Sequence, residues 1–578
     1  MLTGAQLIAS SLKVQGVSVV FGIVGIPVVE IGEACTAAGI RFIAFRNEQA
    51  AGYAASAWGY LTGTPGVCLV VSGPGLVNAL SGIVNANINK WPLVILGGSC
   101  ETDLVGYGAF QELDQVGFCK PHTKYSAKPN SPEQIPYIIE RGFNHAVNGV
   151  PGAVYLDFPA DYINAEINTA SVARSTQFVT KLVSPLQNAV DSAAQLILSA
   201  KAPLIIIGKG SAYAACEDRI LELVDLIQAP FLPTPMGKGV ISDNHALNAS
   251  AARSLALASA DVIVILGARL NWILGFGRQF NKSAKIIHAD VDVNEINSSV
   301  PIEVPLVGHL QCTIQMLVQS ISRQLKELPA GIYTTNNTDQ ATAKREYMEA
   351  IATKIAQNKQ RALELVKNRN VMPMTYYTAF NEIKPLLPPN VVFISEGANT
   401  MDIARSFFEF ELPRRRLDAG TYGTMGVGLG YAIAAQIAYP HERVVAVVGD
   451  SAFGFSAMEI ETAVRNKLPL IIIVINNSGI YFGLSRSQFD GCFHSTPDPN
   501  APDSMVTQSM IPTTALLPEV AYHDLAIALG GSGYCARTPT ELNSALTIAL
   551  QTNSNTVLIN CLIDPGAKKK LEFNWMKK

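Results

Sequence analysis

Short apolar runs recur along the chain, and each is followed by Gly or Asn and then by a segment with the composition of a helix. Continuous apolar runs of this kind are typical of parallel strands that are covered on both faces. Strands that alternate with helices indicate βαβ units. We therefore predict an α/β protein with three domains, each an open, mostly parallel sheet flanked by helices, over residues 1–172, 185–326 and 373–578.

The apolar runs themselves are the predicted strands. They are residues 17–21, 41–45, 67–71, 93–96 and 153–156 in the first block, 204–207, 262–266 and 285–288 in the second, and 391–394, 444–448, 470–475 and 556–559 in the third. Pro159 is expected to end the strand near it, because proline cannot continue a sheet ladder. A polar stretch at 333–340 predicts a linker, and the charged segment that runs to about residue 368 predicts a surface helix. Ligands of open parallel sheets bind at the carboxyl ends of the strands.

Composition and charge narrow the class of protein. Hydrophobic residues make up 48% of the chain and charged residues 15%, which supports large cores and argues against disorder. The net charge of −3 lacks the basic surplus of a nucleic-acid-binding protein, and the short basic runs at 414–416 and 568–570 indicate solvated surface. The nine cysteines contain no C-x-x-C pair, which argues against a disulfide framework or a zinc site. With no signal peptide or membrane-length apolar stretch visible, we expect an intracellular protein without a membrane span.

Two strand ends in the third block carry oxygen ligands. The strand 444–448 runs into Gly449-Asp450-Ser451, and the strand 470–475 runs into Asn476-Asn477-Ser478-Gly479. The interval suits a strand, a crossover helix and a second strand, so both turns are expected at the same edge of one sheet. Mg²⁺ prefers hard oxygen ligands and commonly bridges phosphates.

These turns predict a magnesium site. The expected ligands are the Asp450 carboxylate, the Asn477 side-chain oxygen and the Gly479 main-chain carbonyl. The backbone amides of Ser451 and Ala452 are expected to open a helix and hold phosphate oxygens. The alternative is a pair of ordinary strand-end turns, with Asp450 capping a helix and Asn477 in a tight turn.

Glu48 is a candidate catalytic carboxylate in the first block. It directly follows the predicted strand 41–45 and precedes a run of small residues. A carboxyl group in such a strand-to-helix turn can exchange a proton with a ligand. The alternative is an acidic residue that only stabilises the first turn of a helix.

The segment 417–432 is rich in glycine and contains Gly423 and Met425. Glycines allow the backbone to approach a ligand closely. Met425 is a candidate apolar support for that ligand, and plain core packing is the alternative.

The paired turns resemble the thiamine diphosphate signature, in which G-D-(G/S) is followed by N-N after a similar interval. Longer stretches resemble the 2-hydroxyacyl-CoA lyase family, with oxalyl-CoA decarboxylase as its neighbour. These stretches are residues 21–27, 72–75, 233–239, 267–272, 395–402 and 449–455.

The resemblance implies thiamine diphosphate and Mg²⁺ as cofactors. It implies that Glu48 hydrogen-bonds the aminopyrimidine ring, that Met425 supports the bent cofactor and that the Gly423 carbonyl accepts from its amino group. It also implies that Gln111 orients the substrate in catalysis. Further cofactor contacts are expected at Asn399, Thr400, Ser451, Ala452 and Ile480.

The implied reaction cleaves a 2-hydroxyacyl-CoA into formyl-CoA and an aldehyde one carbon shorter, as in fatty acid α-oxidation. Phe110 and Gln111 stand where the decarboxylase pattern resembles Tyr-Glu, which favours a substrate with a long aliphatic chain. The main alternative activity is that of oxalyl-CoA decarboxylase. A weaker alternative is an acetolactate-synthase-like activity, and a remote alternative is a non-catalytic homologue that binds a nucleotide.

The family resemblance also concerns partners and location. The central block resembles a domain that binds the nucleotide part of CoA or ADP, with Lys209, Arg269 and Asp290 as candidate contacts and ordinary surface charge as the alternative. The cofactor is expected between two subunits, with Glu48 from one and Asp450 from the other, in a homodimer or homotetramer. Family members are often peroxisomal, but the ending Lys577-Lys578 is not an S-K-L-type tail, so a cytoplasmic location stays open.

Overall fold

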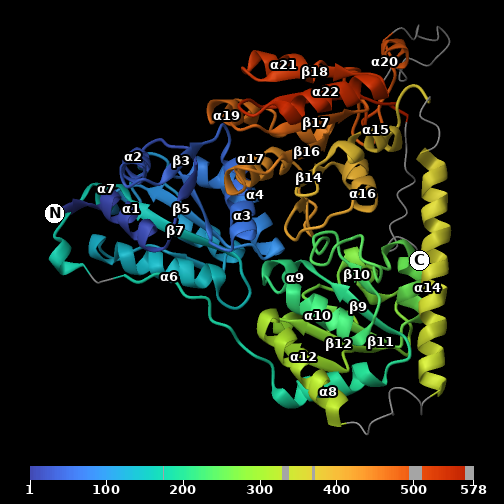
Figure 1. The fold of residues 1–578 in the computed structure, drawn as a ribbon. Helices are drawn as coiled ribbons and strands as arrows, with labels where there is room; N and C mark the ends of the chain where they lie inside the picture. Colours follow the sequence, from blue (N-terminus) through green and yellow to red (C-terminus); the bar gives the residue numbers. More distant parts are fainter. Residues whose placement is uncertain (173–174, 328–337, 367–370, 494–510, 567–578) are drawn as a thin grey trace, which may run out of the picture.

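The computed structural model describes residues 1–172, 175–327, 338–366, 371–493 and 511–566. It contains three parallel sheets, each flanked by helices, and the prediction of an α/β fold with three open sheets is confirmed. Figure 1 shows the N-terminal sheet on one side, the C-terminal sheet at the top and the central sheet below it.

The N-terminal sheet has the strand order β3-β2-β4-β5-β7-β6. Its strands are β2 (Val19–Gly22), β3 (Arg41–Ala44), β4 (Gly66–Val70), β5 (Leu93–Ser99), β6 (Tyr125–Ala127) and β7 (Ala153–Pro159). The helices around it are α1 (Gly4–Val14), α2 (Val29–Ala37), α3 (Glu48–Thr62), α4 (Pro74–Asn89), α5 (Gln115–Cys119), α6 (Ile135–Val147) and α7 (Ala160–Asn164). A separate antiparallel pair joins β1 (Leu2–Thr3) to β8 (Glu166–Ile167). The sheet strand β7 ends at Pro159, as predicted.

The central sheet has the strand order β10-β9-β11-β12-β13. Its strands are β9 (Pro203–Ile207), β10 (Phe231–Pro233), β11 (Val262–Leu266), β12 (Lys285–Asp290) and β13 (Val304–Val307). The helices are α8 (Gln187–Ser199), α9 (Lys209–Tyr213), α10 (Glu217–Ile227), α11 (Arg253–Ser259), α12 (Leu310–Glu327) and α14 (Thr338–Val366). Helix α14 is the predicted charged surface helix and runs along the outside of the central sheet (Figure 1). Most of the predicted linker before it lies outside the described residues.

The C-terminal sheet has the strand order β15-β14-β16-β17-β19-β18. Its strands are β14 (Val392–Glu396), β15 (Arg416–Asp418), β16 (Val444–Gly449), β17 (Ile471–Asn476), β18 (Ser532–Ala536) and β19 (Val557–Leu562). The helices are α15 (Tyr376–Ile383), α16 (Ala398–Phe407), α17 (Gly428–Ala438), α18 (Asp450–Phe453), α19 (Glu459–Arg465), α20 (Arg486–Gly491), α21 (Tyr522–Ala528) and α22 (Pro539–Gln551).

The N-terminal and C-terminal sheets share one topology. If the strands of each sheet are numbered along the chain, both sheets have the order second, first, third, fourth, sixth, fifth. The order reverses direction between the first and third strands, which are β14 and β16 in the C-terminal sheet. Such a switch point is where open parallel sheets bind ligands, at the carboxyl ends of the strands.

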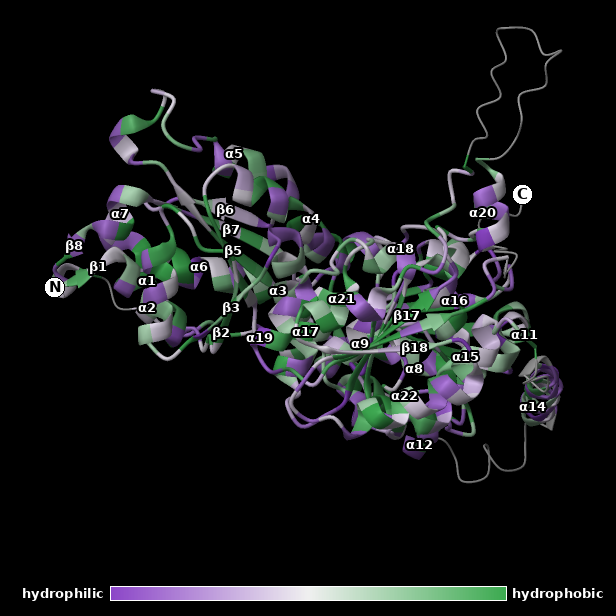
Figure 2. Ribbon diagram, turned by 90° about the horizontal axis from the view of Figure 1, so that it is seen from above, coloured by the Kyte–Doolittle hydropathy of each residue, from purple (hydrophilic) through white to green (hydrophobic). Residues whose placement is uncertain are grey.

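The central strands are buried because helices cover both faces of each sheet. Every residue of β17 is buried, as is every residue of β5. Figure 2 shows the strands at the centre of the sheets in the hydrophobic colour, whereas the outer helix α14 is mostly polar. One hydrophobic core joins the N-terminal and C-terminal sheets through α3 and α17, where Tyr53 packs edge-on against Tyr431. Among the described residues, no helix is both long and apolar enough to cross a membrane.

The prediction of solvated surface for the basic run 414–416 is wrong for Arg416. Its side chain is 1% exposed and pairs with Asp418 at 2.8 Å, and Arg405 approaches the same carboxylate at 2.9 Å. Burial alone would raise the pKa of Asp418, but the two guanidinium charges lower it well below its ordinary value. Arg416 lies on the edge strand β15, where its charge is neutralised inside the protein. The basic run 568–570 lies outside the described residues.

Candidate active site

A cavity of about 610 Å³ opens at the carboxyl edge of the C-terminal sheet, between the ends of β14, β16 and β17. It lies at the switch point of the sheet. All the site residues predicted in the C-terminal block line this one cavity. They are Asn399, Thr400, Gly423, Met425, Asp450, Ser451, Ala452, Asn477, Gly479 and Ile480. The sequence therefore identified the lining of one cavity from segments that are far apart in the chain.

The two strand-end turns meet as predicted. Strands β16 and β17 are parallel neighbours, and Gly449 pairs with Ile475 in their register. Asp450 accepts a hydrogen bond from the Ser451 amide at 2.8 Å through Oδ1 and one from the Gly479 amide at 3.1 Å through Oδ2. Asp450 is the first residue of α18, but the N-cap residue is Gly449, so Asp450 does not cap the helix as the alternative expected. Its carboxylate binds the second turn instead, which two separate turns would not require.

Asp450 is 2% exposed, and burial raises the pKa of its carboxyl group to about 7. A nearby cation would favour the charged form of this group. Asn477 donates from Nδ2 to the Tyr481 carbonyl at 3.2 Å, so its amide orientation is set by the protein. The described residues contain no group of three or more His, Cys, Asp or Glu side chains that could hold a metal ion. A site with one carboxylate and neutral oxygens is the kind that binds Mg²⁺ together with a phosphate ligand.

The first turn of α16 forms another wall of the cavity. Asn399 donates from Nδ2 to the Tyr481 carbonyl at 2.9 Å, which links this helix to the turn after β17. Its Oδ1 is buried and has no hydrogen-bond partner among the described residues. A buried acceptor without a partner is costly, so this atom fits a site that a polar ligand occupies. Gly397 precedes the helix at a φ of 98°, a conformation that favours glycine.

The segment with Gly423 and Met425 forms the facing wall, and a residue that the sequence analysis did not single out holds it. Glu396, at the end of β14, accepts hydrogen bonds from the Gly426 amide and, at 2.7 Å, from the Gly428 amide. Its side chain is fully buried, and burial raises its pKa to about 7. In the sequence, Glu396 is marked only as an acidic residue at the end of an apolar strand, within the stretch 395–402 that resembles the lyase family.

Replacing Gly428 with Ala is expected to lower the free energy of unfolding by about 1–3 kcal/mol, the usual cost of overpacking a tight site. A Cβ atom at Gly428 would lie 2.6 Å from the Glu396 Oε2 and 2.8 Å from a Val448 methyl group. Chemical denaturation measures the change. Gly491, in α20, is the matched control because a Cβ there meets nothing within 4 Å. Equal stability of the two variants would contradict the close packing around Gly428.

Glu48 is the first residue of α3, and Asn47 caps that helix by accepting from the Gln49 amide at 2.8 Å. The Glu48 carboxylate is half-buried and accepts from the Asn78 side chain at 3.2 Å. Glu48 is not among the residues that line the C-terminal cavity of its own chain. One chain therefore does not bring together the two carboxylates that the sequence analysis assigned to one site.

Gln111 lies in the loop before α5, also outside the C-terminal cavity. Its φ of 56° is uncommon for a residue other than glycine. The side-chain Oε1 is buried without a hydrogen-bond partner among the described residues, whereas the neighbouring Phe110 is 66% exposed. Uncommon backbone conformations and unpaired buried acceptors are typical of functional sites.

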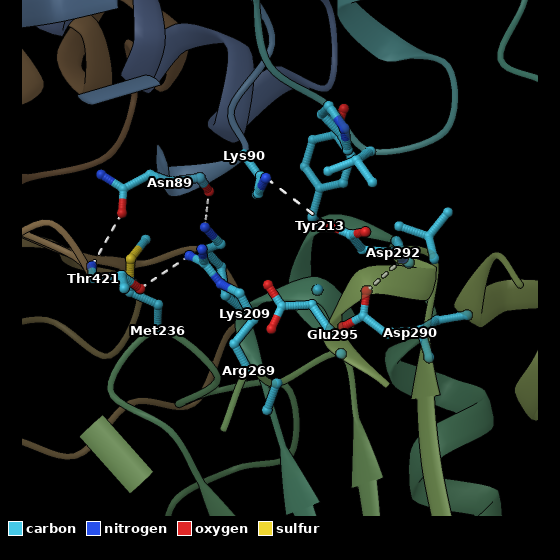
Figure 3. Close-up of a pocket in the computed structure, with 18 of the residues that line it drawn as sticks. Asn89, Lys90, Lys209, Tyr213, Met236, Arg269, Asp290, Asp292, Glu295 and Thr421 are labelled. Atoms are coloured by element: carbon cyan, nitrogen blue, oxygen red, sulfur yellow. Dashed lines mark hydrogen bonds and ion pairs between the residues drawn. The ribbon is translucent and has the colours of Figure 1, made fainter. Parts of the chain in front are cut away.

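The candidate nucleotide contacts Lys209, Arg269 and Asp290 line a second cavity of about 160 Å³ beside the central sheet, drawn in Figure 3. Arg269 donates to the Ile88 carbonyl at 2.9 Å, and Lys209 donates to the Asn89 carbonyl. Both cations thus bind the last carbonyls of α4, a favourable place for positive charge. Lys209 is partly buried and bonded to the Asn89 carbonyl, so it is not an ordinary exposed surface charge, and burial lowers its pKa well below the ordinary value.

Comparison with known proteins agrees with this geometry. Three domain models of the thiamine pyrophosphate enzyme family match the chain. The N-terminal TPP binding domain matches residues 2–118, the central domain matches residues 190–317, and the C-terminal TPP binding domain matches residues 396–561. The chain belongs to the thiamine pyrophosphate enzyme family.

Its relatives include 2-hydroxyacyl-CoA lyase 1 of Mus musculus, 44% identical with 100% of this chain and 96% of the relative aligned. The Homo sapiens 2-hydroxyacyl-CoA lyase 1 is also 44% identical, with 100% and 97% aligned. Oxalyl-CoA decarboxylase of Escherichia coli (strain K12) is 38% identical, with 98% and 96% aligned. The predicted resemblance to 2-hydroxyacyl-CoA lyases, with oxalyl-CoA decarboxylase as a neighbour, is therefore confirmed.

Proposed function

We propose that this protein is a lyase that depends on thiamine diphosphate and Mg²⁺ and cleaves 2-hydroxyacyl-CoA into formyl-CoA and an aldehyde one carbon shorter. The observation that carries the proposal is similarity over the whole chain to proteins named 2-hydroxyacyl-CoA lyase. The cavity at the C-terminal switch point supports it, because every residue assigned there to the cofactor lies on its wall. The proposed pathway is fatty acid α-oxidation, in a peroxisome or in the cytoplasm.

The cavity walls assign a part of the cofactor to each segment. Asp450, Asn477 and the Gly479 carbonyl would hold Mg²⁺. The amides of Ser451 and Ala452, together with Asn399 and Thr400, would hold the diphosphate. Gly423, Met425 and Ile480 would contact the organic rings. When bound, thiamine diphosphate supplies an electron sink for the carbanion that carbon–carbon cleavage leaves.

The residues of the chain have three tasks in this reaction. Glu48 would hold and transfer the proton at the cofactor pyrimidine nitrogen. Gln111, whose Oε1 has no partner in the described part of the chain, would accept a hydrogen bond from the substrate hydroxyl group and so orient the bond that breaks. The buried walls would exclude water from the reacting carbon.

The activity is tested by supplying the purified protein with a 2-hydroxyacyl-CoA, thiamine diphosphate and Mg²⁺. Formyl-CoA and the shortened aldehyde are expected in equal amounts, and mass spectrometry of both measures them. Carbon dioxide released from oxalyl-CoA would instead support the second candidate, oxalyl-CoA decarboxylase, which the 38% identical relative favours. Consumption of pyruvate would indicate an acetolactate-synthase-like activity. A protein that binds no thiamine diphosphate in calorimetry would be the non-catalytic homologue.

A complete site requires a second subunit, in a homodimer or homotetramer, because Glu48 does not line the cavity with Asp450. Large apolar side chains at the chain surface support such an interface, including Phe455 at 56% and Ile480 at 49% exposure. The proposed domains are residues 1–172, 185–326 and 373–578. Each shared site would then lie between the N-terminal domain of one subunit and the C-terminal domain of the other.

Mixing two inactive variants tests the shared site. Glu48→Gln and Asp450→Ala chains are co-expressed with different tags, and the mixed oligomer is purified through both. Each mixed pair contains one site with both native carboxylates, so activity is expected to return to about a quarter to a half of the native value. Mixed oligomers without activity, beside equally stable single-variant oligomers, would indicate that each site lies within one chain.

The central cavity is proposed to bind the nucleotide part of CoA or ADP. Asp290, which is partly buried at the end of β12, would accept from a ribose hydroxyl group. Asp290→Asn is expected to weaken ADP binding by about 10-fold, the usual effect of one charge-assisted hydrogen bond. Calorimetry measures the affinity, with Glu303→Gln, an exposed acid in the same domain, as the control. Equal affinities would remove Asp290 from the proposed contacts.

A further inference from the structure

Glu396 links the two walls of the C-terminal cavity. Its main chain ends β14 and continues through Gly397 into α16, whose first turn carries Asn399 and Thr400. Its side chain crosses to the opposite wall, the segment with Gly423 and Met425. Glu396 itself does not line the cavity, so it can influence a ligand only through these neighbours.

The carboxylate is bound at both oxygens. Oε1 accepts from the Gly426 amide, and Oε2 accepts from the Gly428 amide at 2.7 Å. These two amides flank the start of α17, directly after Met425. Gly426 has a φ of 87°, so the chain turns sharply there. The turn that presents Met425 is therefore fastened to the end of β14 by the Glu396 side chain, and its Thr424 also donates to Asn85 at 2.8 Å.

A second carboxylate fastens the other end of the same segment. Asp418 accepts from the Gly420 amide at 2.8 Å through Oδ1, while its Oδ2 accepts from Arg405 and Arg416. Arg405 lies on α16, the helix that begins just after Glu396. Residues 419–425 thus lie between two buried carboxylates. Glu396 belongs to β14, and Asp418 is bound by Arg405 of α16.

We propose that Glu396 is a positioning residue, which holds the Gly423–Met425 segment at a fixed distance from the first turn of α16 and so sets the spacing between the ring-binding and diphosphate-binding walls. The inference rests on the proposed cofactor site and assigns it a residue that no cofactor atom touches. A glutamine cannot replace the carboxylate, because its amide nitrogen would face one of the two backbone N–H donors. One amide of the turn would then be buried without an acceptor.

Glu396→Gln tests the role, and the first measurement needs no cofactor. Hydrogen–deuterium exchange in the cofactor-free protein is expected to rise at least about tenfold for residues 419–428, while residues 444–448 of β16 keep their protection. Thiamine diphosphate is expected to bind at least about 10-fold more weakly in calorimetry with saturating Mg²⁺. The remaining activity at saturating cofactor should show a lower kcat with little change in the substrate KM.

Asp243→Asn is the matched control. Asp243 is another buried acid, which accepts from the Phe410 amide at 2.9 Å and pairs with Lys238, but it lines neither cavity. This variant is expected to lose stability while its cofactor affinity stays within about twofold. If Glu396→Gln behaves in the same way, with unchanged exchange at 419–428, Glu396 is only structural and the inference is overturned.

Gly428→Ala disturbs the contact between Glu396 and Gly428 by changing the glycine, and it is used if Glu396→Gln does not fold. Its added methyl group would push against Oε2, so weaker cofactor binding and faster exchange of the same segment are expected. Native affinity in a folded Gly428→Ala protein would overturn the inference. Failure of the native protein to bind thiamine diphosphate would instead overturn the proposed function. The hydrogen–deuterium exchange measurement would still test whether Glu396 holds residues 419–428 in place.

Discussion

Glu48→Gln is expected to lower kcat by at least about 100-fold, the usual contribution of a positioned acid or base. The amide keeps the size of the side chain and can retain the contact with Asn78, but it cannot hold or transfer a proton. Formyl-CoA production at saturating thiamine diphosphate, Mg²⁺ and substrate measures the loss. Cofactor affinity should change much less than kcat, because the metal and diphosphate contacts lie on other residues.

The control for this prediction is Glu30→Gln. Glu30 is an exposed acid in the first turn of α2, as Glu48 is an acid in the first turn of α3. Its replacement is expected to leave kcat within about twofold of the native value. If both variants keep native activity, Glu48 only stabilises the start of its helix and has no catalytic role.

Asp450→Ala is expected to weaken Mg²⁺-dependent binding of thiamine diphosphate by at least about 100-fold, because even residues that only orient metal ligands contribute 10- to 100-fold. The variant loses the carboxylate of the proposed metal site and also the contact with the Gly479 amide that joins the two turns. Calorimetry with Mg²⁺ and with a chelator measures the metal-dependent part of the affinity.

Asp524→Ala is its control, since Asp524 is an exposed acid in the first turn of α21 in the same domain. Native affinity is expected for this variant. An Asp450→Ala protein that still binds the cofactor with native, metal-dependent affinity would contradict the assignment of Asp450 as a ligand.

Much of the fold could be predicted because strands covered on both faces are continuous apolar runs. β16 and β17 are of this kind, and the sequence identifies both. The edge strand β3 was predicted, but most edge strands escape the pattern, because one side of such a strand has no neighbour and few apolar residues are needed. β6 and β15 have three residues each, and β15 carries the charged pair Arg416 and Asp418. Charge patterning alone could not show that Arg416 is buried, since its partners come from the fold.

The candidate site could be predicted where residues that can bind a metal ion directly follow a recognisable strand. Asp450 and Asn477 follow recognisable strands, so their meeting at one edge follows from βαβ geometry. Glu396 was not predicted, because its importance comes from the amides of Gly426 and Gly428, which only the folded chain brings to it. The separation of Glu48 from the cavity was implied only by the family resemblance, because no local pattern reports which subunit completes a site.

In the proposed mechanism, the two turns after β16 and β17 together hold one metal ion and its diphosphate ligand. A crystal structure of the protein with thiamine diphosphate and Mn²⁺ in place of Mg²⁺, with an anomalous difference map, tests this directly. The map is expected to show one strong peak within coordination distance of Asp450 Oδ, Asn477 Oδ1 and the Gly479 carbonyl, next to the diphosphate. A peak elsewhere in the protein, or a cofactor bound away from these turns, would contradict it.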